Sequence, residues 1–215
     1  MKVLVTGGAG YIGSTICSAL EDNNHVPVIM DSLVNGSRTF TEGKKFYKAD
    51  ISDSKALKEI FRDHKDIEAI IHCAALVIVP ESVQKPYLYY QENVSKSLEL
   101  FKFASDSKIK VIFSSTAAVY KSSEEQMVTE NSPLDPDSPY ARTKITIEMA
   151  LRDFCNAYGS RAISLRYFNP IGADPKMRSG PSAETPTHIL GKLLSIYEGK
   201  ESDFKTGRAP RRQRA

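Results

Sequence analysis

Apolar and polar residues along most of the chain follow two alternating patterns. Short β-branched runs predict strands, and longer segments with apolar residues every three or four positions predict amphipathic helices. The expected strands are Val3–Thr6, Val26–Met30, Lys45–Tyr47, Glu68–His72, Lys110–Ser114 and Ala162–Arg166. The expected helices are Ile12–Asp22, Ser54–His64 (with Ser52 or Ser54 as N-cap), Pro86–Ser105 and Pro139–Tyr158. This alternation, with nearly continuous apolar strands, predicts an α/β fold, a Rossmann-type doubly wound parallel sheet with helices on both faces.

The regular alternation ends near Phe168. Residues 169–187 are rich in Gly, Pro and Ser and predict a long loop, which a helix over His188–Glu198 follows. We therefore expect a domain over residues 1–168, only the beginning of a second, small domain over residues 169–205, and an atypical basic tail over residues 206–215.

Charge, hydropathy and cysteine content exclude several classes of protein. The chain has 29 Lys and Arg against 26 Asp and Glu, and four arginines in the tail account for the excess, which argues against nucleic acid as a partner. No apolar run approaches the roughly 20 residues of a membrane helix, and no apolar signal segment opens the chain. The three widely spaced cysteines are typical of reduced thiols. We expect a cytoplasmic protein with no membrane partner.

A glycine-rich motif follows the first expected strand directly and opens the first expected helix. It reads Gly7-Gly-Ala-Gly10-Tyr11-Ile12-Gly13. Glycines let the backbone turn tightly and approach a pyrophosphate, while the helix directs N–H groups and the positive end of its dipole toward it. The alternative is a tight turn without a ligand, but the place of the motif between strand and helix favours a dinucleotide site.

An acidic residue at the end of the second strand indicates which dinucleotide. Asp31 follows the glycine motif at about the 20-residue spacing of such sites, and its carboxylate can accept hydrogen bonds from the adenosine ribose hydroxyls. It would repel a 2′-phosphate, which favours NAD, although Arg38 could pair with that phosphate and leaves NADP open. Asp50 and Ile51 follow the third strand and could hold adenine, but Asp50 by itself is more typical of a cap of the next helix.

A tyrosine and a lysine begin the helix that Ser138-Pro139 introduces. Tyr140 and Lys144 are four residues apart, which puts the phenol and the ammonium on one helix face. Free tyrosine has a pKa of about 10, and a neighbouring cation favours the phenolate, which makes Tyr140 a usable proton acceptor. The cluster Ser114-Ser115-Thr116 ends the preceding strand, where ligands bind in this class of fold. The pattern predicts oxidation and reduction of a secondary alcohol.

The histidines and cysteines show no arrangement for other chemistry. The four histidines lack metal-ligand spacing, so we expect no metal site. His72, at a strand end, is more typical of a packed core histidine than of a base. The cysteines lack a histidine partner, which argues against a cysteine nucleophile.

Several motifs together resemble the extended short-chain dehydrogenase/reductase family, and within it the UDP-glucose 4-epimerases. The motifs are TGGAGYIGS, Asp31 with Asn35, HCAA at 72–75, PESVQKP, SPYARTK and RYFNPIGADP, and the resemblance covers residues 2–205. It implies tightly bound NAD as a recycled oxidant: the hydride from sugar C4 passes to the cofactor, the 4-keto sugar rotates, and the hydride returns to the opposite face. UDP-glucose and UDP-galactose would be interconverted by a homodimer built on the helices Pro86–Ser105 and Pro139–Tyr158.

The resemblance also assigns roles to individual residues. Tyr140 would be the proton acceptor, Lys144 would bind the nicotinamide ribose and tune Tyr140, and Thr116 would be the catalytic hydroxyl. The residues expected to contact the cofactor are Gly7, Gly10, Tyr11, Ile12, Gly13, Asp31, Ser32, Asn35, Gly36, Asp50, Ile51, Cys73, Ala74, Ala75, Leu76, Val77, Lys144 and Phe168. Those expected to contact the substrate are Thr116, Tyr140, Asn169, His188 and Ile189.

The chain departs from the family pattern at three places. Val77 and Glu92 stand where a lysine and an asparagine are common. After Lys205 the family continues into a nucleotide-binding motif, whereas this chain reads TGRAPRRQRA, which indicates a frame change or truncation that removes most of the uridine diphosphate site. Alanine follows Thr116 where related dehydratases carry an acid, which favours epimerisation. The alternatives are an NAD-binding remnant with little or no activity, or another family member acting on a nucleotide sugar.

Overall fold

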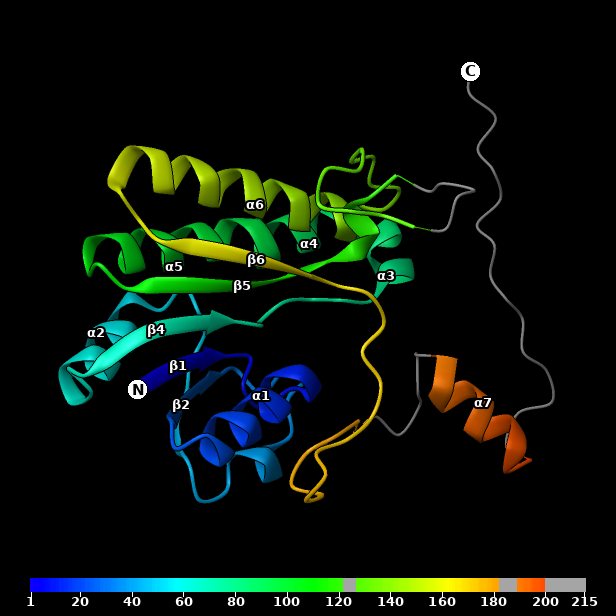
Figure 1. Cartoon of the computed structure of the whole chain (residues 1–215), viewed down its shortest axis with the longest axis horizontal. Coiled ribbons are helices and arrows are strands. Elements are labelled where there is room, and N and C mark those ends of the chain that lie inside the picture. The colour runs from blue at the N-terminus through cyan, green and yellow to red at the C-terminus, as the bar shows by residue number, and fades with distance from the viewer. Residues whose placement is uncertain (122–126, 182–188, 200–215) are drawn as a thin grey trace. The chain divides into compact units, whose positions relative to one another are not determined.

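The computed structural model describes residues 1–121, 127–181 and 189–199. The chain forms two compact units, Met1–Pro181 and Ser182–Ala215. The first unit is built on a six-stranded sheet in which all five neighbouring pairs are parallel, in the order β3-β2-β1-β4-β5-β6 (Figure 1). The strands are β1 (Lys2–Thr6), β2 (Val26–Asp31), β3 (Lys45–Lys48), β4 (Ile67–His72), β5 (Lys110–Thr116) and β6 (Ala162–Tyr167). The predicted Rossmann-type sheet is confirmed, and the strand order reverses direction between β1 and β4.

Helices cover both faces of this sheet, and each face has its own apolar core. On one face, Leu4 and Ile70 pack with residues of α2 (Ser54–Asp63), α5 (Lys96–Asp106) and α6 (Pro139–Tyr158). On the other face, Val3, Val5 and Ile29 pack with Cys17 of α1 (Tyr11–Asp22). Alternate residues of one strand therefore serve opposite cores, because successive side chains of a strand point to opposite faces.

Most helix boundaries lie within a residue or two of those predicted, and the helix caps show why. Ser138 caps α6 through a hydrogen bond to the backbone N–H of Ala141, and Gly159 ends the helix in the left-handed conformation at φ 65°. The prediction of Ser52 or Ser54 as the cap of α2 is wrong. Asp53 accepts from the backbone N–H groups of the second and third following residues instead, because its carboxylate reaches both.

The long helix predicted over Pro86–Ser105 contains a π-helical turn. The segment consists of α4 (Pro86–Tyr89), the π-helix η2 (Tyr90–Ser95) and α5. A shorter helix, α3 (Val79–Gln84), precedes it and was not predicted. A π-turn contains one residue more than an α-turn, so it interrupts the 3.6-residue periodicity on which the prediction rested. Such turns occur frequently at functional sites.

The second unit contains α7 (Ile189–Tyr197), which agrees with the helix predicted over His188–Glu198. His188 and the basic tail lie outside the described residues. Among the helices that the structure describes, none is long and apolar enough to cross a membrane.

Candidate functional site

The glycine motif forms the connection between β1 and α1, and the backbone of this connection is tightly packed. Gly7 has φ 69°, which favours glycine, and a Cβ there would lie 2.6 Å from the backbone nitrogen of Ala74. A Cβ on Gly13 would lie 2.2 Å from the carbonyl oxygen of Gly7. These two glycines are therefore required by the packing of the protein itself.

Gly10 differs from the other two because protein packing does not account for it. A Cβ there would meet a single protein atom within 4 Å, the carbonyl oxygen of Gly7 at 3.3 Å. Gly10 is the N-cap of α1, and no side chain caps the helix. The N–H groups at this end of α1 thus face a position that a phosphate can approach closely, so the motif fits a dinucleotide pyrophosphate.

Asp31, at the end of β2, is buried against the glycine motif. Its carboxylate oxygens accept hydrogen bonds from the backbone N–H groups of Ala9 at 3.0 Å and Leu33 at 2.8 Å. A Cβ on Gly36 would lie 2.9 Å from the same carboxylate, so the loop after β2 closes on Asp31. Each carboxylate oxygen has a second lone pair, which leaves capacity to accept hydrogen bonds from ribose hydroxyls.

Three other residues were considered for the adenosine end of the site: Ser32, Asn35 and Arg38. Ser32 and Asn35 lie in the same loop and are exposed. The guanidinium of Arg38, considered for a 2′-phosphate, stacks on the ring of Phe46 at 4.4 Å from the ring centroid. That contact occupies one face of the guanidinium, whereas Asp31 binds the backbone of the glycine motif directly at Ala9.

Asp50, expected at the adenine, is bound to Lys96. One carboxylate oxygen accepts from the backbone N–H and hydroxyl of Ser52, and the other accepts from the Lys96 ammonium at 2.7 Å. The hydrogen bonds from Lys96 and Ser52 hold the pKa of Asp50 below its ordinary value although burial opposes them. Ile51 is buried beside it. The carboxylate is therefore ionised and fixed in position.

The segment that follows β4 is held at the strand ends by an asparagine that the sequence analysis did not identify. Asn93, fully buried in η2, accepts from the backbone N–H of Leu76 at 2.8 Å and donates to the carbonyl oxygen of Leu76 at 3.0 Å. Its amide also donates to the Thr143 hydroxyl, which donates to the Tyr140 carbonyl oxygen. Glu92, at the position where an asparagine is common, pairs with Lys96.

Other residues of this segment lie near the glycine motif. The backbone N–H of Cys73 donates to the carbonyl oxygen of Thr6, which brings residues 73–77 beside the glycine motif. Val77 is exposed there. His72 is a buried core residue as predicted: its ring nitrogens hydrogen-bond the Thr6 and Ser97 hydroxyls, and burial lowers its pKa to about 3.

The tyrosine and lysine of α6 face the end of β5, as their spacing predicts. The Lys144 ammonium is buried, donates to the carbonyl oxygen of Ser114 at 2.8 Å and lies 6.0 Å from the centroid of the Tyr140 ring. Tyr140 lies beside the Thr116 hydroxyl. The three residues assigned to catalysis are therefore brought together at one edge of the sheet.

Burial governs the acid–base properties of this pair. Burial raises the pKa of Tyr140, while the hydrogen bond with Thr116 lowers it. Burial also lowers the pKa of Lys144 to about 8. The expected lowering of the tyrosine pKa by its lysine neighbour is thus outweighed in this structure, since desolvation disfavours both charged forms. Burial therefore opposes the phenolate form of Tyr140, and a further positive charge nearby would favour it.

A buried ion pair continues the stripe of Tyr140 and Lys144 by one more helical turn. Glu148 accepts a hydrogen bond from the Ser115 hydroxyl and is bound by both Nε and Nη2 of Arg166, the latter at 2.6 Å. Arg166 lies on β6 and stacks over the ring of Tyr120. Positions 140, 144 and 148 of α6 therefore contact residues 116, 114 and 115 of β5, which fixes the register of the helix on the strand.

The expected substrate residues are placed in part. Asn169 follows β6 closely and is exposed, as is its neighbour Phe168, which was expected at the cofactor. His188 lies outside the described residues, and Ile189 begins α7 in the second unit. No group of three or more His, Cys, Asp or Glu positioned for a metal ion occurs among residues that the structure describes.

Comparisons with known proteins agree with this geometry. Residues 3–213 match the family described as the NAD dependent epimerase/dehydratase family. The chain is 42% identical over 201 residues to UDP-glucose 4-epimerase of Azospirillum brasilense, covering 93% of this chain and 58% of that protein. A 39% identical relative, UDP-glucose 4-epimerase of Lactobacillus helveticus, is covered over 62% of its length. The chain thus spans about three-fifths of the length of these relatives.

Solved structures give the same result. The crystal structure of UDP-glucose 4-epimerase from Brucella ovis in complex with NAD is similar with a TM-score of 0.89 and 34% identity, over 94% of this chain and 62% of that chain. The Stenotrophomonas maltophila UDP-glucose 4-epimerase, with bound NAD and formylated UDP-arabinopyranose, has a TM-score of 0.88 at 34% identity, over 94% of this chain and 63% of that chain. The resemblance that the motifs indicated is confirmed, and with its glycine cradle and tyrosine–lysine pair the chain belongs to the NAD dependent epimerase/dehydratase family.

Proposed function

We propose that this protein binds NAD and epimerises a nucleotide sugar at C4 through a 4-keto intermediate, with UDP-glucose and UDP-galactose as the interconverted pair. One observation carries the proposal: the Tyr140 phenol, the Lys144 ammonium and the Thr116 hydroxyl meet at the carboxyl end of β5. The glycine cradle lies at the same edge of the sheet, at the switch point between β1 and β4. Ligands bind at this place in doubly wound folds.

The residues of the chain have distinct parts in this reaction. Bound NAD supplies the hydride acceptor and donor, and its positively charged nicotinamide favours the phenolate. Tyr140 takes the proton of the C4 hydroxyl at its phenolic oxygen and returns it after the sugar has turned. Thr116 orients the C4 oxygen of the sugar. Lys144 holds the ribose hydroxyls of the cofactor and adds positive charge beside the phenol.

Removal of the phenolic hydroxyl tests the catalytic part of the proposal. Tyr140→Phe is expected to lower the conversion of UDP-glucose to UDP-galactose by about 100- to 10,000-fold, the usual contribution of a proton-transfer group, and to leave NAD affinity nearly unchanged. Tyr158→Phe, at the exposed far end of the same helix, is the matched control. Near-normal turnover in Tyr140→Phe would show that the assignment is wrong. Retention of NAD without turnover in the unmodified chain would support the alternative of an NAD-binding protein without activity.

Asp31 is expected to set the choice of cofactor. Asp31→Ala should weaken NAD binding and reduce the preference for NAD over NADP, because the carboxylate that repels a 2′-phosphate is gone. Asp31 also holds the backbone at Ala9 and Leu33, so the informative quantity is the ratio of the two affinities, which general loosening of the loop does not shift. Equal affinity of the unmodified protein for NAD and NADP would contradict this role.

We also propose that the protein forms a homodimer through α5 and α6. The two helices pack on the same face of the sheet, and α6 exposes Met149 and Tyr158. A matching pair from a second copy would bury these side chains in a four-helix contact. Sedimentation at several concentrations tests this, and a Met149→Glu variant should shift the equilibrium toward monomer.

A further inference from the structure

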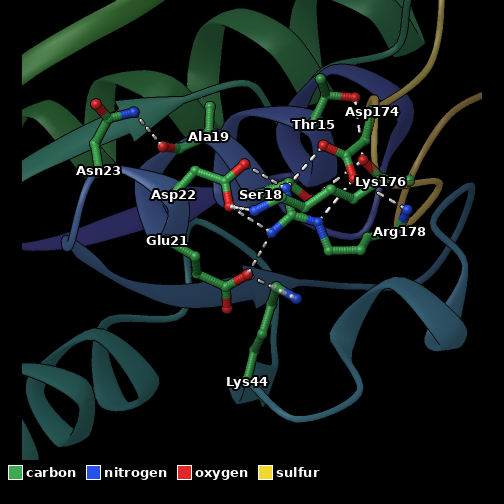
Figure 2. A network of polar contacts seen from close by, with 11 residues as sticks. Thr15, Ser18, Ala19, Glu21, Asp22, Asn23, Lys44, Asp174, Lys176 and Arg178 are labelled. Atoms are coloured by element: carbon green, nitrogen blue, oxygen red, sulfur yellow. Dashed lines mark hydrogen bonds and ion pairs between the residues drawn. The ribbon is translucent and has the colours of Figure 1, made fainter.

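The segment that follows β6 is fastened to α1 by contacts along the length of that helix, and Figure 2 shows those in its second half. At the start of α1 the Tyr11 hydroxyl donates to the carbonyl oxygen of Gly172 at 2.8 Å. One turn later the Ser179 hydroxyl lies 3.4 Å from the Thr15 hydroxyl, and it lies 3.5 Å from the Ser18 hydroxyl. Ser18 and Ser179 are both buried, so this contact is part of a packed interface.

At the end of α1 the segment is held by an arginine that binds two carboxylates. The Arg178 guanidinium donates to both oxygens of Asp22, at 2.9 and 2.8 Å, and to both oxygens of Asp174, at 2.7 and 2.8 Å. Asp174 is buried, and its paired arginine holds its pKa well below the usual range. Lys176 adds a further bond to Asp22 at 2.7 Å. The cations also lie at the helix C-terminus, where the helix dipole favours positive charge.

The α1 residues in these contacts share one face of the helix. Their spacing of i, i+4, i+7 and i+11 is that of a single helical stripe, which consists of Tyr11, Thr15, Ser18 and Asp22. The opposite side of α1 packs on the sheet through Cys17. The stripe is therefore a docking face for residues 172–179 of the same chain.

Between the end of β6 and Gly172, the chain passes the carboxyl ends of the strands. Tyr167 ends β6 beside Thr116 of β5, and Gly172 is already bound to the start of α1, next to β1. Three strand spacings separate β6 from β1, about 14 Å, and five residues span about 17 Å when fully extended. In Figure 1 the segment after β6 passes the carboxyl ends of the neighbouring strands before it reaches α1, on the side of the sheet where the switch point lies.

We propose that residues 168–172 form a strap over the cofactor site at the carboxyl ends of the strands, that residues 172–179 anchor this strap to α1, and that Arg178 is its latch, so that the bound dinucleotide leaves only when Arg178 separates from Asp22 and Asp174. This proposal rests on the proposed binding of NAD. It assigns to Arg178 and Asp174 a positioning role in cofactor retention, separate from the chemistry at Tyr140. Release of the latch frees the strap while the glycine cradle and Asp31 remain in place.

The rate of cofactor release tests the latch. The protein is loaded with NADH, excess NAD is added, and the loss of bound nicotinamide fluorescence is followed. Arg178→Gln and Asp174→Asn are each expected to speed release by about tenfold or more, the usual effect of losing hydrogen bonds between charged groups. Lys176→Gln, which removes one exposed contact with Asp22, should have a smaller effect, and Arg62→Gln, on α2, should have none.

A reversible crosslink tests the strap independently of the ion pairs. The Ser18 and Ser179 hydroxyl oxygens are 3.5 Å apart, so a Ser18→Cys/Ser179→Cys variant places two thiols where a disulfide can join the anchor of the strap to α1. The oxidised variant should release NADH more slowly than the unmodified protein, and reduction should restore the rate. The single variant Ser18→Cys is the control for oxidation alone. The Ser18→Cys/Ser179→Cys variant also tests the strap if Arg178→Gln fails to fold.

The outcomes separate this inference from the proposed function. If the unmodified protein does not bind NADH, the proposed function and the strap are both overturned. If NADH binds and turnover depends on Tyr140, but neither Arg178→Gln nor the disulfide changes the release rate, then the strap alone is overturned. A merely structural role for Arg178 would lower the free energy of unfolding measured without cofactor and leave the release rate unchanged.

Discussion

Lys144→Met is expected to stabilise the protein at neutral pH while removing a residue of the proposed catalytic pair. Burial lowers the pKa of Lys144 from 10.5 to about 8, so keeping its charged form in the fold costs about 3 kcal/mol at about 1.4 kcal/mol per pH unit. Methionine has a similar length and no charge. Loss of the hydrogen bond to the Ser114 carbonyl oxygen costs about 1 kcal/mol. The net gain at pH 7 is about 2 kcal/mol.

The pH dependence has a definite sign. Below the folded-state pKa of about 8, Lys144 is charged in both the folded and the unfolded protein. Between about 8 and 10.5 the unfolded chain binds a proton that the folded protein does not, so the free energy of unfolding contributed by Lys144 rises with pH. Between pH 7 and about pH 10, the free energy of unfolding rises by about 2.5 kcal/mol from this source. The advantage of Lys144→Met should therefore shrink by that amount between pH 7 and pH 10.

Urea denaturation of both proteins without added cofactor, at neutral and alkaline pH, measures this difference. Burial raises the pKa values of the Cys17 and Cys73 thiols to about 12, so both proteins lose stability as these thiols ionise in the unfolded chain. The comparison of the two proteins at each pH cancels the loss at Cys17. The Lys144 charge lowers the pKa of the Cys73 thiol, so Lys144→Met loses more stability at this thiol at alkaline pH, in the same direction as the expected shrinkage. A variant that is less stable at pH 7, with a stability difference that does not change with pH, would refute the assignment of a desolvated ammonium at this position.

Two further predictions follow from contacts around the site. Glu148→Gln leaves Arg166 without its buried carboxylate and should lower the free energy of unfolding by about 3 kcal/mol, measured by urea denaturation. The control is Glu99→Gln on α5, because the Glu99 carboxylate makes no ion pair among the described residues. Equal losses of stability in the two variants would contradict the prediction. Asn93→Ala removes the two hydrogen bonds that hold Leu76 and should weaken NAD binding about tenfold by calorimetry, whereas an unchanged affinity would show that residues 73–77 keep their place without it.

The parts of the fold that depend on hydrophobic patterning could be predicted from the sequence, and so could the site residues that depend on spacing within one element. Gly7, Gly13, Tyr140 and Lys144 belong to this group, because a turn or a single helix fixes their relative positions. Contacts between elements distant in sequence could not be predicted in this way. Asn93 lies in a π-turn that breaks the helical periodicity.

The polar stripe of α1 was missed for a related reason. Tyr11, Thr15, Ser18 and Asp22 have the spacing of a solvated helix face, and only the path of residues 172–179 shows that a chain covers it. Asp50 and Arg178 acquire their partners in the same way, through segments brought together by the sheet. A sequence pattern identifies a polar face without telling whether solvent or protein lies against it.

The π-helical turn at Tyr90–Ser95 makes this part of the chain sensitive to length as well as to composition. Deletion of one residue there would convert the turn into regular α-helix, with better backbone geometry. It would also rotate everything on the N-terminal side by about 100° around the helix axis relative to α5, the angle of one α-helical residue. Asn93 and the α4 side chains would then leave their partners near Leu76 and Ile78. Substitutions along this helix should be tolerated far more readily than any change in the number of residues.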